Sequence, residues 1–85
     1  MKFHARLINK ERPTLLVKKS PTLKTGVLYK IKFVGNKREE ELTSYLRNFN
    51  QEYFCFTFVH KMMGAFNLKY QQDYDIEVNE VSNVK

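Results

Sequence analysis

Apolar and polar side chains alternate along much of this chain with a period of two residues, and this pattern constrains its fold more than any other feature. The alternation is clearest over residues 27–34, where one face would carry Val27, Tyr29, Ile31 and Phe33. An extended strand with this pattern buries one face and exposes the other. Similar runs predict further strands over 2–9, 14–19, 52–60, 65–70 and 74–81.

One segment, residues 36–50, has a different period. Its apolar side chains recur at i, i+3, i+4 and i+7, the spacing of one helical face, at Leu42, Tyr45, Leu46 and Phe49. Asn36 and Glu39 have the spacing of a capping box, with Asn in place of Ser or Thr. The spacing therefore predicts a single helix over 36–50.

The expected element order is β-β-β-α-β-β-β, which makes the fold class α+β and β-rich. Three strands followed by a helix and further strands resemble the order of an OB-fold, a small partly closed barrel that binds oligonucleotides. An antiparallel sheet covered by one helix is the alternative. With 85 residues and 42% hydrophobic content, the chain can build one core. We expect a single compact domain over 1–81 and a short C-terminal tail over 82–85.

The reactive side chains argue against an enzyme. The chain has one cysteine, Cys55, and two histidines, His4 and His60. Cys55 and His60 are five residues apart on one predicted strand, so they point to opposite faces and cannot share a metal ion. The three glycines are far apart and form no phosphate-binding loop. We expect no catalytic residues, no metal and no cofactor.

The same residues bear on where the protein works. A lone cysteine excludes a disulfide within the chain and suits a reducing compartment. The N-terminal residues carry charges where an export signal needs an apolar core, and no apolar run is long enough to span a membrane. A cytoplasmic protein without a membrane partner is the expectation.

Charge is divided unevenly along the chain. Residues 1–38 carry eleven Lys and Arg against one acid, giving +10, whereas residues 39–85 carry four against eight, giving −4. These two values sum to the net charge of +6. Such a split indicates an anionic partner, or two halves that neutralise each other in the fold.

The basic half favours nucleic-acid binding as the function, with single-stranded DNA or RNA held on a basic sheet face. Lysine and arginine side chains neutralise phosphates, and exposed aromatic rings stack on bases. The candidate residues are Arg6, Lys18, Lys19, Lys30, Lys32, Tyr53 and Tyr70, and His4 is expected on the same basic face. The alternative is a protein-interaction module that regulates or inhibits a larger protein, with a homodimer as a further possibility.

Two segments, 23–33 and 68–78, test these hypotheses because they share the pattern L-K-x-x-x-x-Y-x-I-x-[FV] with opposite charges. Lys30 corresponds to Asp75, and Lys32 corresponds to Glu77. If the two strands are neighbours, cross-strand ion pairs neutralise part of the basic face. If they are far apart, both lysines remain free for phosphate.

Overall fold

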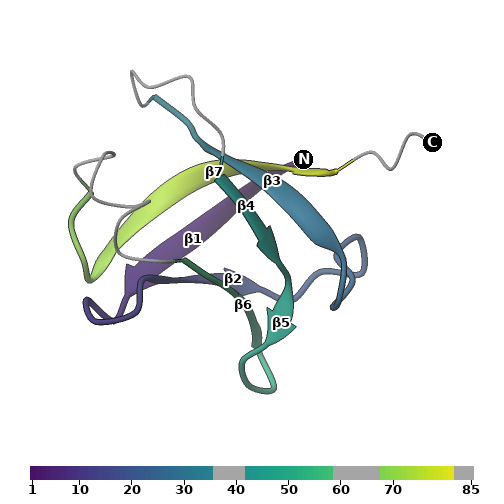
Figure 1. Ribbon diagram of the computed structural model, residues 1–85, viewed down its shortest axis with the longest axis horizontal. Helices are drawn as coiled ribbons and strands as arrows, with labels where there is room; N and C mark the ends of the chain where they lie inside the picture. The colour runs from purple at the N-terminus through teal and green to yellow at the C-terminus, as the bar shows by residue number, and fades with distance from the viewer. Residues whose placement is uncertain (36–41, 59–67, 82–85) are drawn as a thin grey trace.

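The computed structural model describes residues 1–35, 42–58 and 68–81, which form one antiparallel sheet (Figure 1). Its strands are β1 (Lys2–Ile8), β2 (Thr14–Lys18), β3 (Leu28–Phe33), β4 (Leu42–Tyr45), β5 (Arg47–Asn48), β6 (Tyr53–Thr57) and β7 (Gln72–Glu80). Within these ranges there is no helix, and so none long and apolar enough to cross a membrane.

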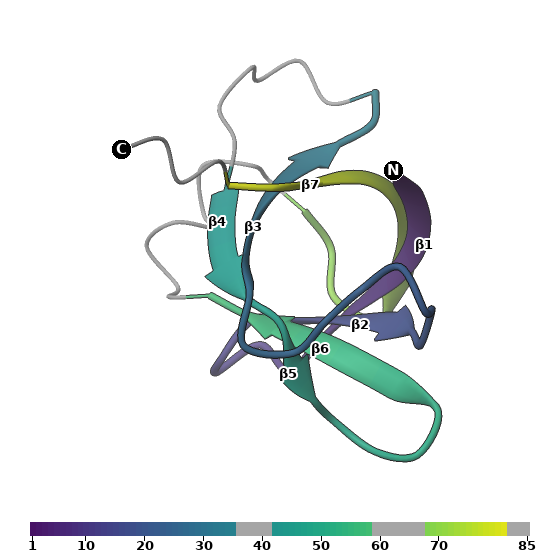
Figure 2. The same cartoon turned by 90° about the vertical axis from the view of Figure 1, so that its right-hand side faces the viewer.

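The sheet curls into a nearly closed barrel (Figure 2). Its strand order is β4-β3-β7-β1-β2-β6-β5. The two outermost strands, β4 and β5, are consecutive pieces of the chain separated by Leu46; β4 pairs with β3, and β5 pairs with β6. Ser44 on β4 also donates its hydroxyl to the carbonyl oxygen of Thr57 on β6, at 3.0 Å. Residues 42–48 therefore join both ends of the sheet, which limits the exposed strand edge.

A single hydrophobic cluster fills the barrel. The inward positions of β1, β2, β3 and β7 supply Ala5, Leu7, Leu15, Val17, Tyr29, Ile31, Phe33, Ile76 and Val78. Phe56 and Phe58 are also buried and Phe54 is half-buried against the cluster, which confirms that the stripe of these three phenylalanines belongs to the core; residues 59–60 lie outside the described ranges. Tyr29 meets Phe56 edge to face, and its hydroxyl accepts a hydrogen bond from the backbone N–H of Lys24 at 3.0 Å. The one polar atom of this buried ring is therefore satisfied.

The predicted helix over 36–50 is wrong for the residues that the structure describes, because 42–45 and 47–48 are strands. Leu42, Ser44 and Leu46 are the buried residues of this segment, at alternate positions. Tyr45 and Phe49 belong to the expected helical face, yet they are 53% and 47% exposed. The β-rich barrel is confirmed, but the helix that suggested an OB-like order is replaced by strands; residues 36–41 lie outside the described ranges.

The boundaries of the last elements also differ from expectation. Of the predicted strand 65–70, residues 65–67 lie outside the described ranges and residues 68–70 are not a strand. Leu68 and Tyr70 instead pack against the core. Gln71, with φ of 63°, turns the chain, so β7 begins at Gln72 rather than at the predicted Tyr74.

Candidate functional site

An open hollow lies on the outer surface of the barrel, across β1, β2, β6 and β7. It has a volume of about 470 Å³ and is lined by His4, Arg6, Leu16, Lys18, Tyr53 and Asp73, which together are called the basic hollow below. The strand register places Arg6 opposite Leu16, and Lys18 opposite Tyr53. Outward positions of neighbouring strands thus bring cationic groups, an aromatic ring and an aliphatic side chain to one place.

Lys18 provides the lysine cation that lines this hollow, and Lys19, the next residue, lies outside its lining. Lys18 is exposed, and Tyr53, its cross-strand neighbour, is half-buried. The Lys19 ammonium lies 5.3 Å from the centre of the Phe54 ring, within range of a cation–π contact. The ion pairs within 4.0 Å among the described residues involve His4 and Arg6, so neither lysine is neutralised by a carboxylate there.

Arg6 differs from these lysines because it is already paired. Its guanidinium donates to a carboxylate oxygen of Asp73 at 3.2 Å and to the carbonyl oxygen of Gln71 at 3.1 Å. Asp73 is its register partner on β7. Within the described residues, Arg6 is therefore a predicted phosphate ligand whose charge is already balanced by a carboxylate.

His4 lies between two carboxylates of β7. Its Nδ1 is 3.2 Å from an oxygen of Asp75, and its Nε2 is 3.5 Å from an oxygen of Asp73. The pKa of His4 is raised above its ordinary value of 6.5, mainly by the hydrogen bond to Asp75 and to a lesser extent by the one to Asp73. The imidazolium form is favoured here because each ring nitrogen then has a proton to donate.

Lys30 and Lys32 lie elsewhere, on β3, and β7 separates that strand from β1. The two segments with opposite charges are indeed neighbours, since β3 pairs with β7. The register places Lys32 opposite Glu77, as expected, but Lys30 opposite Asn79 rather than Asp75. Asp75 instead faces His4. Lys30 and Lys32 on β3, with Glu77 on β7, therefore form a separate group outside the basic hollow, called the charged strip below.

Tyr70 does not join Tyr53 in the hollow. It is half-buried and packs against the hydrophobic core beside the turn at Gln71. Tyr53 is half-buried as well, so what separates the two rings is position: Tyr70 does not line the basic hollow. Tyr53 is the aromatic side chain that lines the basic hollow.

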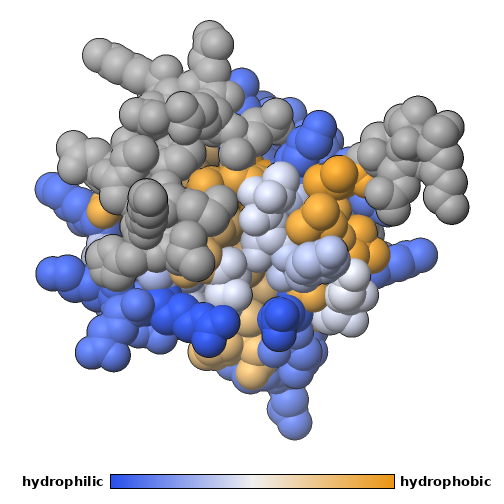
Figure 3. Space-filling view, in the orientation of Figure 1, coloured by the Kyte–Doolittle hydropathy of each residue, from blue (hydrophilic) through white to orange (hydrophobic). Residues whose placement is uncertain are grey.

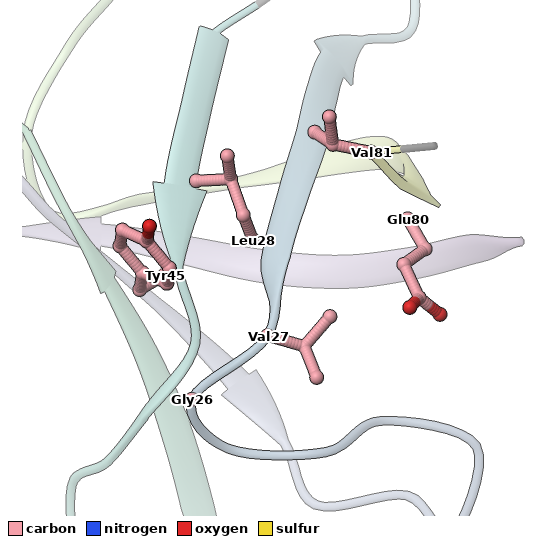
Figure 4. A pocket seen from close by; sticks show the side chains of 6 residues that line it. All are labelled: Gly26, Val27, Leu28, Tyr45, Glu80 and Val81. Atoms are coloured by element: carbon pink, nitrogen blue, oxygen red, sulfur yellow. The ribbon is translucent and has the colours of Figure 1, made fainter. Parts of the chain in front are cut away.

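A second hollow, of about 260 Å³, lies where β3 begins and β7 ends (Figure 4). It is lined by Gly26, Val27, Leu28, Tyr45, Glu80 and Val81, and is called the second hollow below. Leu28 lies opposite Tyr45 in the β3–β4 register. Figure 3 shows hydrophobic surface gathered on the side where β7 ends. Glu80 is an exposed acidic group beside the apolar side chains of Val27 and Val81 at this site.

Other reactive groups offer little chemistry. In 1–35, 42–58 and 68–81, no group of three or more His, Cys, Asp or Glu side chains is placed to hold a metal ion. Cys55 is buried, as expected for a small core residue. Burial raises the pKa of its thiol above the ordinary value of 9.0, against the opposing charge of Arg47. The thiol therefore stays protonated near neutral pH and is a poor nucleophile.

The basic hollow brings together three of the seven predicted site residues, Arg6, Lys18 and Tyr53. Sequence reasoning missed Leu16 and Asp73, because their membership depends on which strands are neighbours. Compared with protein-family models, curated proteins and solved structures, the chain has no match. Any assignment of function therefore follows from the side chains of the two hollows.

Proposed function

We propose that this protein binds single-stranded nucleic acid in the basic hollow and catalyses no reaction. The observation that carries the proposal is the placement of Lys18 directly opposite Tyr53, beside Leu16, on an open outer face. A phosphate would lie against the ammonium group of Lys18, with Lys19 outside the lining as a further cation, while one base rests on the Tyr53 ring and Leu16. Stacking on an aromatic ring tolerates any base, so we expect weak sequence preference.

A single strand fits this surface better than a duplex. Tyr53 and Leu16 offer flat contact to the face of a base, and base faces are hidden inside a stacked duplex. The volume of about 470 Å³ is within the range of small-ligand sites, which suits a short stretch of unstacked strand. Because Asp73 lies in the same hollow and balances Arg6, the affinity should depend mainly on two lysines and one ring.

Salt dependence tests the proposal. Two to three phosphate contacts predict that affinity for an oligothymidylate falls roughly tenfold between about 50 and 200 mM salt. Fluorescence anisotropy with a labelled single strand measures this change, and a duplex of the same length is the control, expected to bind more weakly. Absence of saturable binding at the lower salt concentration, or binding that does not respond to salt, would contradict the proposal.

The second hollow supports a second candidate, docking of a segment from a larger protein. Tyr45 is 53% exposed, and aromatic side chains of this kind often anchor protein interfaces. Glu80 lies beside Val27 and Val81 and forms no ion pair within the described residues. The fitting partner segment would carry an apolar side chain next to a lysine or arginine.

Charge reversal at Glu80 tests this second candidate. We expect wild-type protein to retain one partner from nuclease-treated lysate, and Glu80→Lys to lose that same partner because like charges then meet. Lys18→Ala, in the other hollow, is the control and should retain it. Retention by Glu80→Lys would contradict docking at this hollow, and a dimer in sedimentation that Glu80→Lys dissociates would identify the partner as a second copy of the chain.

A further inference from the structure

We infer that protonation of His4 controls the affinity of the basic hollow for single-stranded nucleic acid. This inference rests on the proposed function and adds regulation to it. His4 lines the same hollow as Lys18 and Tyr53, and its side chain is 67% exposed, so the imidazole exchanges protons freely with solvent.

The two carboxylate contacts of the His4 imidazole require a proton on each ring nitrogen. Asp75 and Asp73 each face a different ring nitrogen of His4, at 3.2 and 3.5 Å. A neutral imidazole has one N–H donor, so its other nitrogen would direct a lone pair at a carboxylate. Only the imidazolium satisfies both contacts, so protonation and this arrangement of side chains stabilise each other.

The balance of charge beside the hollow depends on this proton. The charged groups that face His4 or adjoin it on β1, β7 and β2 are Lys2, Arg6, Asp73, Asp75, Glu77 and Lys18. Glu77 lies opposite Lys2 on β1 and Lys32 on β3, so its charge is offset by these lysines and adds no net negative charge at the hollow. Two aspartates then face one arginine, which leaves one net negative charge when His4 is neutral and none when it is protonated. A phosphate held by Lys18 is repelled in the first state only.

The direction of the effect follows from the raised pKa. Contacts with Asp75 and Asp73 keep His4 protonated above pH 6.5, its ordinary value. The stabilisation that these contacts give the fold is complete below about pH 6.5 and is lost as the pH rises through the raised pKa. Nucleic-acid affinity should change in the same direction, and binding should take up a proton because the two equilibria are linked.

A pair of binding titrations tests the inference. We expect wild-type protein to bind oligothymidylate about threefold to tenfold more tightly at about pH 6 than at about pH 8.5, at constant low ionic strength. His4→Gln should remove this dependence, and His4→Lys should bind with the tighter affinity at both pH values because its charge is permanent. His60→Gln is the matched control for the other histidine and should behave as wild type.

The outcomes separate this inference from the proposed function. If wild-type protein binds but His4→Gln keeps the same pH dependence, the inference is overturned and the binding function stands. If wild-type protein fails to bind at about pH 6 and low salt, both are overturned. A nuclear magnetic resonance titration of free protein is independent of any nucleic acid: a His4 midpoint above 6.5 is expected, and one at or below it overturns the inference.

Discussion

Phe56→Ala is expected to destabilise the barrel by about 3–5 kcal/mol, because it removes a fully buried ring from the centre of the core. The ring meets Tyr29 edge to face at 6.0 Å between centroids, an interaction that adds to the energy of burial. A domain of 85 residues has a total stability of roughly 4–13 kcal/mol. This one substitution therefore removes a large part of what holds the fold.

The comparison for this prediction is Phe49→Ala, the same substitution at a ring that is 47% exposed. We expect that variant to remain within about 1 kcal/mol of wild type. Urea denaturation followed by circular dichroism measures the free energy of unfolding of both variants. In thermal denaturation, a loss of about 3 kcal/mol or more lowers the Tm by roughly 12 °C or more. Equal stability of the two variants would show that β6 does not pack Phe56 into the core.

The strands with strict alternation were predicted, whereas the strands over 42–48 were mistaken for part of a helix, for one physical reason. In 27–34 every inward position is apolar, so the period of two residues is unbroken. In 42–48 the inward position between Leu42 and Leu46 is a serine, which keeps its place by donating to the Thr57 carbonyl oxygen. That polar residue obscures the strand period and leaves the helical spacing as the stronger signal. The partner carbonyl is 13 residues away and belongs to another strand, so local pattern could not identify it.

The site was predicted in part. The sequence shows which residues lie on the outward faces of the predicted strands, but it does not show which strands are neighbours or in what register they pair. Lys18 and Tyr53 are outward residues of predicted strands, yet nothing local shows that β2 and β6 are neighbours. The similar segments 23–33 and 68–78 do pair, but antiparallel. In the antiparallel register Lys32 lies opposite Glu77, whereas Asp75 lies opposite His4 and not opposite Lys30. Of the predicted cationic residues, Arg6 and Lys18 thus line the hollow, whereas Lys30 and Lys32 lie apart from it on β3.

That separation leads to the second large effect. The double substitution Lys18→Ala with Tyr53→Ala is expected to weaken binding of single-stranded nucleic acid by about 30-fold or more. Stacking on one ring contributes roughly 1–3 kcal/mol, and the lost ammonium removes a phosphate contact. Lys18→Ala alone should also reduce the slope of log affinity against log salt by about one. Anisotropy titrations at several salt concentrations measure both quantities.

The matched control is Lys30→Ala with Lys32→Ala, which removes twice as much charge as Lys18→Ala but from β3, beyond β7. If net charge alone attracted the strand, this control would weaken binding more than Lys18→Ala does. If the basic hollow is the site, the control changes affinity by less than about threefold, and Tyr53→Phe, which keeps the ring, retains binding. A larger loss from the β3 lysines would place the nucleic acid on the charged strip, because only direct contact there can exceed the effect of Lys18.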